Sequence, residues 1–203
     1  MYSGFMGNGA LRLYTLINRA SLFNAYFISS PTLDENYLGI ISGARAGLSS
    51  LNDNMRFLYL SYGEHRYEKD QTDSVLQLTS MLQQKAPKSL EWHVEKDEHN
   101  YMSRPLVNVL NGIELLFDDY HSDLTADSTI SAKGADAIIE YYKTLSEKKY
   151  GFAVSAERSL KNLAKSYLNS APERSIAIYE KVIGLYPDSA YAFDALAEAY
   201  DKT

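Results

Sequence analysis

Cysteine is absent from the 203 residues of this chain, so disulfides, thiol nucleophiles and cysteine-ligated metal sites are all excluded. Basic residues are in the minority, because 20 lysines and arginines stand against 26 aspartates and glutamates, and the formal net charge is −6. No basic stripe stands out along the chain. We therefore expect neither a nucleic acid nor an anionic membrane surface as a partner, since both are recognised through clustered positive charge.

Long apolar runs are missing as well. No segment approaches the roughly 20 apolar residues that a membrane-spanning helix needs, and Met1 is not followed by a basic and then apolar signal segment. The four histidines are scattered and form no His-x-x-x-His pair, so neither a metal site nor a cofactor is predicted. What remains is the composition of an ordinary soluble globular protein, 45% hydrophobic and 23% charged, whose cellular location the sequence leaves open.

Strands that alternate with helices are predicted for the first 120 residues. Short buried or alternating apolar runs indicate strands at residues 26–29, 57–62 and 90–95, and segments with helical spacing separate them. Pro105 suits the first turn of a further helix, which continues to about Phe117. Strands separated by helices pair in parallel through right-handed crossovers. The predicted fold class is therefore α/β, with a parallel sheet covered by helices.

An internal repeat marks the last fifty residues. The segment "LKNLAKSY" at 160–167 matches "FDALAEAY" at 193–200 with an offset of 33, and the helical segment "SIAIYEKVIGLYP" lies between them. Two helices per roughly 34 residues, with small and aromatic residues in phase, are the signature of a tetratricopeptide repeat. The residues that recur in phase are Leu163, Ala164 and Tyr167, followed by Leu196, Ala197 and Tyr200.

These patterns divide the chain into three parts. We expect a partial α/β domain over residues 1–127, a connector helix within 128–154 and an all-α, tetratricopeptide-like tail over 155–203. Only about one and a half repeats are present, whereas a stable stack usually needs at least three. The tail helices must therefore pack on the α/β part, on further repeats or on another chain, which leaves a protein partner and a homo-oligomer open.

The stretch "GFMGNGALRLYTLINRASLFNAYFISSPTL", residues 4–33, resembles a serine-hydrolase turn with its following helix and strand. The similarity is to the esterase D, feruloyl esterase and enterobactin-esterase-like group of α/β hydrolases. In that group the run is similar to Gly-His-Ser-Leu-Gly-Gly, a helix ending near Asn-Arg-Pro, then Leu-Phe and a strand running to Ser-Pro-Ser-Leu. A count without gaps back from Asn18–Arg19 and Ser30–Pro31 aligns Met6 with the serine of that motif. Gly4 then aligns with the first glycine of the motif.

The resemblance covers about residues 4–120 and implies the C-terminal half of an α/β-hydrolase sheet. It also implies hydrolysis of a small ester through an acyl-serine intermediate. The turn normally follows the fifth strand of an eight-stranded sheet, but here it lies within a few residues of Met1. We therefore expect the N-terminal half of the sheet to be absent from this chain.

Met6 changes the chemistry that the resemblance implies. A thioether has no ionisable proton and cannot form an acyl-enzyme, so the expected activity is lost at this position. Gly7 follows, and its amide is the expected oxyanion donor. Ser3 is the alternative nucleophile, because a shifted turn "YSGFMG" would place it at the apex. That shift needs a three-residue insertion and puts Phe5 where a glycine is wanted.

The other members of a catalytic triad follow from the family order of serine, acid and histidine. His99 lies in the loop after the last predicted strand and before the last helix of the domain, which resembles the family's histidine loop. Glu64 directly follows the strand at 57–62 and is our candidate for the acid, with Glu68 as the alternative. The acid would hold the imidazole in one tautomer and stabilise its protonated form.

Three functions are compatible with these observations. The first is an esterase-like α/β hydrolase without activity, because of Met6 and the missing half of the sheet. The second is a non-catalytic module that binds a protein partner through its tetratricopeptide-like tail. The third is an active serine esterase that uses Ser3.

Overall fold

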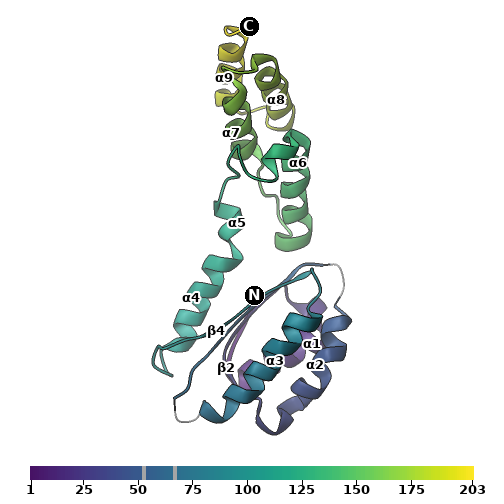
Figure 1. Ribbon diagram of the computed structural model, residues 1–203, viewed down its shortest axis with the longest axis vertical. Helices are drawn as coiled ribbons and strands as arrows, with labels where there is room; N and C mark the ends of the chain where they lie inside the picture. Colours follow the sequence, from purple (N-terminus) through teal and green to yellow (C-terminus); the bar gives the residue numbers. More distant parts are fainter. Residues whose placement is uncertain (52–53, 66–67) are drawn as a thin grey trace. The chain divides into compact units, whose positions relative to one another are not determined.

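Four parallel strands form one sheet in the order β1-β2-β3-β4 (Figure 1). The computed structural model describes residues 1–51, 54–65 and 68–203, which divide into two units, 1–118 and 119–203. The sheet belongs to the first unit. Its strands are β1 (Tyr2–Met6), β2 (Ala25–Pro31), β3 (Arg56–Tyr62) and β4 (Leu90–Lys96).

The parallel pairing predicted for three of these strands is confirmed. β2 pairs with β3 and β3 with β4, so that Tyr26 lies opposite Leu58 and Leu58 opposite Trp92. β1 was not predicted, because it has only five residues, one of them a glycine, and is too short to show a pattern of period two. It pairs with β2, and the register shifts between Phe5 and Met6 where the chain leaves the strand.

Helices cover both faces of the sheet (Figure 1). They are α1 (Gly7–Asn18), α2 (Ile40–Ser49), α3 (Thr72–Lys85) and α4 (Arg104–Leu116), with short 3₁₀ turns at Ala20–Leu22, Asp34–Gly39 and Lys69–Gln71. Successive strand residues point to opposite faces. Ile28 of β2 and Leu60 of β3 therefore share one core with α1, α2 and α3.

The opposite face of the sheet packs against α4. Phe27 and Tyr59 belong to a second core with Leu116 and its neighbours on that helix. A Cβ added at Gly112 would lie 2.7 Å from the Phe27 ring, so the glycine allows α4 to approach β2 closely. This packing fixes the helix start, Arg104, near the carboxyl ends of the strands.

The second unit consists of helices around a core of its own. They are α6 (Ala135–Thr144), a π-helical turn at Leu145–Tyr150, α7 (Glu157–Tyr167), α8 (Pro172–Leu185) and α9 (Ala190–Tyr200), with a 3₁₀ turn at Ser131–Lys133. The short α5 (Asp118–His121) spans the boundary between the units. Ile138 of α6, Leu163 of α7, Tyr179 of α8 and Ala199 of α9 share one buried cluster. The segment expected to be a connector thus contributes to the core of this unit.

Candidate functional site

A sharp turn joins β1 to α1 at Met6. Its φ of 53° and ψ of −127° lie in a region that non-glycine residues rarely adopt, at a cost of order 1–3 kcal/mol. A Cβ added at Gly4 would lie 2.7 Å from the carbonyl oxygen of Asn8, so the backbone crowds itself as it reverses. The Met6 carbonyl accepts a hydrogen bond from the Thr32 amide at 3.2 Å. The turn presents the half-exposed Met6 side chain at the carboxyl end of the sheet.

Helix α1 begins at Gly7, directly after this turn. The first amides of a helix have no acceptor within the helix, and the aligned peptide dipoles favour negative charge there. The first turn of α1 carries no acidic residue. The Gly7 amide therefore lies at the N-terminus of α1, and its role as an oxyanion donor stays a prediction.

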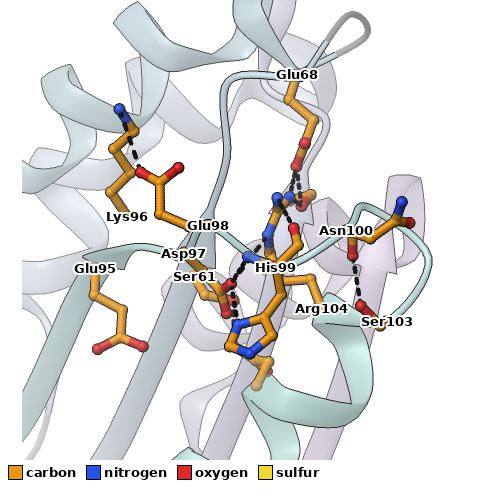
Figure 2. A network of polar contacts seen from close by, with 12 residues as sticks. Ser61, Glu68, Glu95, Lys96, Asp97, Glu98, His99, Asn100, Ser103 and Arg104 are labelled. Carbon is orange, nitrogen blue, oxygen red and sulfur yellow. Dashed lines mark hydrogen bonds and ion pairs between the residues drawn. The ribbon is translucent and has the colours of Figure 1, made fainter.

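His99 pairs with Asp97 in the loop after β4 (Figure 2). The Nδ1 atom of His99 lies 2.8 Å from Oδ1 of Asp97, and the His99 backbone amide donates to the same oxygen at 2.6 Å. The Asp97 side chain is 3% exposed and the His99 side chain 59% exposed. Because a carboxylate only accepts hydrogen bonds, this contact places a proton on Nδ1 of the imidazole. The other ring nitrogen, Nε2, is then the one that can accept a proton.

The two acids predicted from the sequence lie elsewhere. Glu64 accepts a hydrogen bond from Lys96 at 2.8 Å, and this bond raises the pKa of Lys96. Glu68 is buried and accepts hydrogen bonds from Ser30 and Arg104. The structure therefore brings His99 together with Asp97 instead of with either glutamate. The short spacing of Asp97 and His99 in "DEH" favours this pair, whereas the chain order that the resemblance implies places the acid in the loop after β3.

Ser3 lies within β1, opposite Phe27 of β2. Its carbonyl accepts a hydrogen bond from Nε of Arg12 at 2.9 Å. The serine lines a hollow together with Pro105 and Asn108 of α4, and this hollow is separate from the one beside Met6. The turn with Ser3 at its apex is therefore not the turn of this structure, in which positive φ falls on Met6.

A cavity of about 180 Å³ lies beside Met6. Its lining is mainly apolar and aromatic, with several polar groups: Met6, Ser30, Pro31, Thr32, Tyr62, Gly63, Glu68, Gln71, Thr72, Val75 and Tyr101. The Tyr101 hydroxyl donates to the Met6 sulfur, and the Tyr101 ring lies 4.8 Å from that of Phe5. An apolar hollow with a few polar groups is the usual form of a small-molecule site.

Neither a metal centre nor a membrane span is found in the part of the chain that the structure describes. Among residues 1–51, 54–65 and 68–203, no group of three or more histidines and acids converges as metal ligands would. Within those same ranges, every helix is too short or too polar to cross a bilayer.

Comparison with solved structures identifies the fold. A crystal structure of an IroE-like serine hydrolase from Shewanella oneidensis superposes with a TM-score of 0.57 and 20% sequence identity, over 91% of this chain and 58% of that one. The parallel sheet with its covering helices matches an α/β-hydrolase-like fold. An uncharacterised protein from Capnocytophaga ochracea superposes with a TM-score of 0.59 and 17% identity, over 97% of this chain and 61% of that one.

The chain spans about three fifths of the length of these two structures. No protein-family model and no curated protein matches its sequence. The α/β class and the hydrolase-like parallel sheet predicted from the sequence are thus confirmed at the level of the fold.

Proposed function

We propose that this chain keeps the site of an esterase-like α/β hydrolase but cannot form an acyl-enzyme, because Met6 stands at the position of the nucleophile. The observation that carries the proposal is the backbone of Met6. A strained residue between a strand and a helix is how α/β hydrolases expose their nucleophile. Here φ is 53° at that junction, and the side chain is a thioether.

Groups in the loop after β4 and at the start of α1 support an esterase-like origin. His99 would act as the general base and Asp97, in contact with Nδ1, would hold its tautomer and stabilise the imidazolium. The Gly7 amide at the start of α1 would stabilise an oxyanion. The resemblance to the esterase D, feruloyl esterase and enterobactin-esterase-like group makes a small carboxylic ester the ligand class that we propose for the cavity beside Met6.

An ester-hydrolysis assay tests this proposal. Purified protein at neutral pH is expected to hydrolyse p-nitrophenyl acetate no faster than a His99→Ala variant, because Met6 has no proton for His99 to remove. Met6→Ser alone is expected to restore little. The Gly7 amide is the one oxyanion donor that we identify among the described residues, and a missing donor typically costs about 10²–10³ in rate.

One result would overturn the proposal, and a second would change its account of the oxyanion site. Turnover by the unmodified protein that Ser3→Ala abolishes would make Ser3 the nucleophile and place it in a turn unlike the one described. A large gain from Met6→Ser that depends on His99 would support Met6 as the nucleophile position, but it would contradict the expectation that a second oxyanion donor is missing.

A second candidate function, binding of a protein partner by the helical tail, is supported by the surface of α7. Two adjoining hollows of about 390 and 470 Å³ share Asp123, Arg158 and Lys161. Arg158 contacts Asp123 at 3.5 Å and Lys161 contacts Glu157 at 3.1 Å. Lys165 adds a third cation, so the hollows carry an excess of positive charge in a chain whose net charge is −6.

We propose an acidic peptide segment as the occupant of this surface. The Lys161 ammonium lies 4.5 Å from the centre of the Tyr191 ring, so an aromatic wall from α9 flanks the cations of α7. Fluorescence anisotropy with a labelled glutamate-rich peptide should show binding that weakens with salt and with Lys165→Glu. The control Lys202→Glu makes the same charge change outside the hollows. Equal binding of a lysine-rich peptide, or equal loss in both variants, would contradict the proposal.

A further inference from the structure

Arg104 is the largest fully buried side chain among the described residues. It is the first residue of α4, a position where an arginine normally reaches solvent. Its guanidinium donates from Nη1 to Ser30 at 2.9 Å and to the Glu68 carboxylate, and from Nη2 to the His99 carbonyl at 2.8 Å. Figure 2 shows this guanidinium between Glu68 and the loop that carries Asp97 and His99.

The contacts of Arg104 join the exits of three neighbouring strands. Ser30 is near the end of β2, Glu68 follows β3, and His99 follows β4. The space for the guanidinium depends on Gly63, directly after β3, because a Cβ there would lie 2.2 Å from Nη2. One side chain therefore sets the spacing of three loops that meet at the carboxyl edge of the sheet.

The same side chain also connects the histidine loop to the turn at Met6. Ser30 has a φ of 45°, strained for a residue other than glycine, and its hydroxyl donates to Glu68 while accepting from Arg104. The next residue, Pro31, lies opposite Met6 in the β1–β2 pair. The hydrogen bonds of Ser30 with Glu68 and Arg104 thus hold its strained backbone in place. Ser30 directly precedes Pro31, the residue that pairs with Met6.

Charge makes Arg104 difficult to replace. Glu68 and Asp97 are both buried, and Nε of Arg104 lies 3.8 Å from Oδ1 of Asp97, the oxygen that contacts His99. A buried charge is tolerated when it is paired and hydrogen-bonded, and removing one partner leaves the other buried charges unpaired. Lysine would keep the charge, but its single ammonium lacks the planar fork that reaches Ser30, Glu68 and His99 together.

We propose that Arg104 is a positioning residue of this site. It holds the 97–104 loop so that the His99 imidazole stays in the Nδ1-protonated form against Asp97. The role assigned to His99 rests on the proposed function, whereas the clamp itself rests on the contacts of Arg104.

Imidazole ¹⁵N NMR of the full chain at about pH 8, where an ordinary histidine is neutral, tests the proposal. His99→Ala identifies the His99 signals. In the wild type they should show the Nδ1-protonated form. Arg104→Met with Glu68→Gln removes the buried Arg104–Glu68 ion pair as a unit, which favours folding over the loss of one partner alone. It leaves Asp97 in contact with His99 and leaves the His99 carbonyl without its donor. Its His99 signals should shift to those of an imidazole that exchanges between tautomers, and Arg104→Lys should give a smaller shift.

The controls separate positioning from folding. Arg45→Met alters an exposed arginine of α2 and should leave the His99 signals unchanged. Asp97→Asn removes the carboxylate itself and should shift them as far as the double variant does. A folded double variant with wild-type His99 signals would overturn the proposal. A His99 imidazole that exchanges between tautomers in the wild type would also overturn the proposal, whether or not any variant folds. Ester hydrolysis by the unmodified protein would overturn the proposed function and leave this result standing.

Discussion

Replacing Gly63 by alanine is expected to destabilise the first unit strongly. The added Cβ would lie 2.2, 2.5 and 2.7 Å from Nη2, Cζ and Nη1 of Arg104, and that side chain is fully buried. If the backbone shifts to make room, the cost is that of overpacking, about 1–3 kcal/mol. If instead the guanidinium leaves Glu68, a buried charge loses its partner, which typically costs about 3–5 kcal/mol. Either value is a large part of a total stability of about 5–15 kcal/mol.

Urea unfolding followed by tryptophan fluorescence measures this loss, because Trp92 of β4 is the single tryptophan and reports on the sheet. A loss of 3 kcal/mol moves the midpoint by about 1.5 M for a slope near 2 kcal/mol/M. Gly43→Ala in α2 is the matched control, since its Cβ would meet only a methyl group of Ile17 at 4.0 Å. It should be neutral or stabilise by up to about 1 kcal/mol. A Gly63→Ala midpoint equal to that of the wild type would refute the assignment of Arg104 as an immobile clamp.

Two pH dependences follow from shifted pKa values. In the second unit the hydrogen bond from Ser189, followed by Lys161, lowers the pKa of Glu157, so its stabilisation is present above the ordinary value of 4.5 and is lost as pH falls through the lower folded value. At pH values below about 4.5 the melting temperature of that unit should therefore decrease. The decrease should be smaller in the Glu157→Gln variant. In the first unit burial raises the pKa of Tyr26 to about 12, so its stabilisation is complete below pH 10 and is lost as pH rises towards 12. Above pH 10, Trp92 fluorescence should show unfolding at a lower urea concentration, and this change should be smaller in Tyr26→Phe. If either variant kept the pH dependence of the wild type, the residue named as its cause would be wrong.

The sheet was largely predictable because its pattern is local. The runs at β2, β3 and β4 are apolar enough to be recognised singly, and the helices between them dictate parallel pairing. The helix predicted from Pro105 is confirmed as α4, Arg104–Leu116. β1 escaped prediction because five residues that include Gly4 carry too little pattern.

The candidate site was predictable only in part. The position of His99 after the last strand follows from chain order, but its acidic partner depends on where each carboxylate points once the strands have been aligned. Glu64 points to Lys96, and Asp97 is held by the loop of His99 itself. Glu64, Glu68 and Asp97 all follow strands that end at the same edge of the sheet. Residue type and spacing alone therefore could not show which of them contacts His99.

Local sequence is enough to predict the alternation of strands and helices and the lack of a hydroxyl or thiol at Met6, and the resemblance of residues 4–33 implies the sharp turn before α1. These depend on apolar periodicity, on glycine and on residue chemistry, all of which are local. The burial of Arg104, in contrast, follows only from the folded arrangement of the strands. An arginine at a helix start has the local pattern of a surface residue, and its burial requires Ser30, Glu68 and the His99 carbonyl to converge on it from three strand exits. Such a convergence depends on the register of the whole sheet, which no single segment encodes.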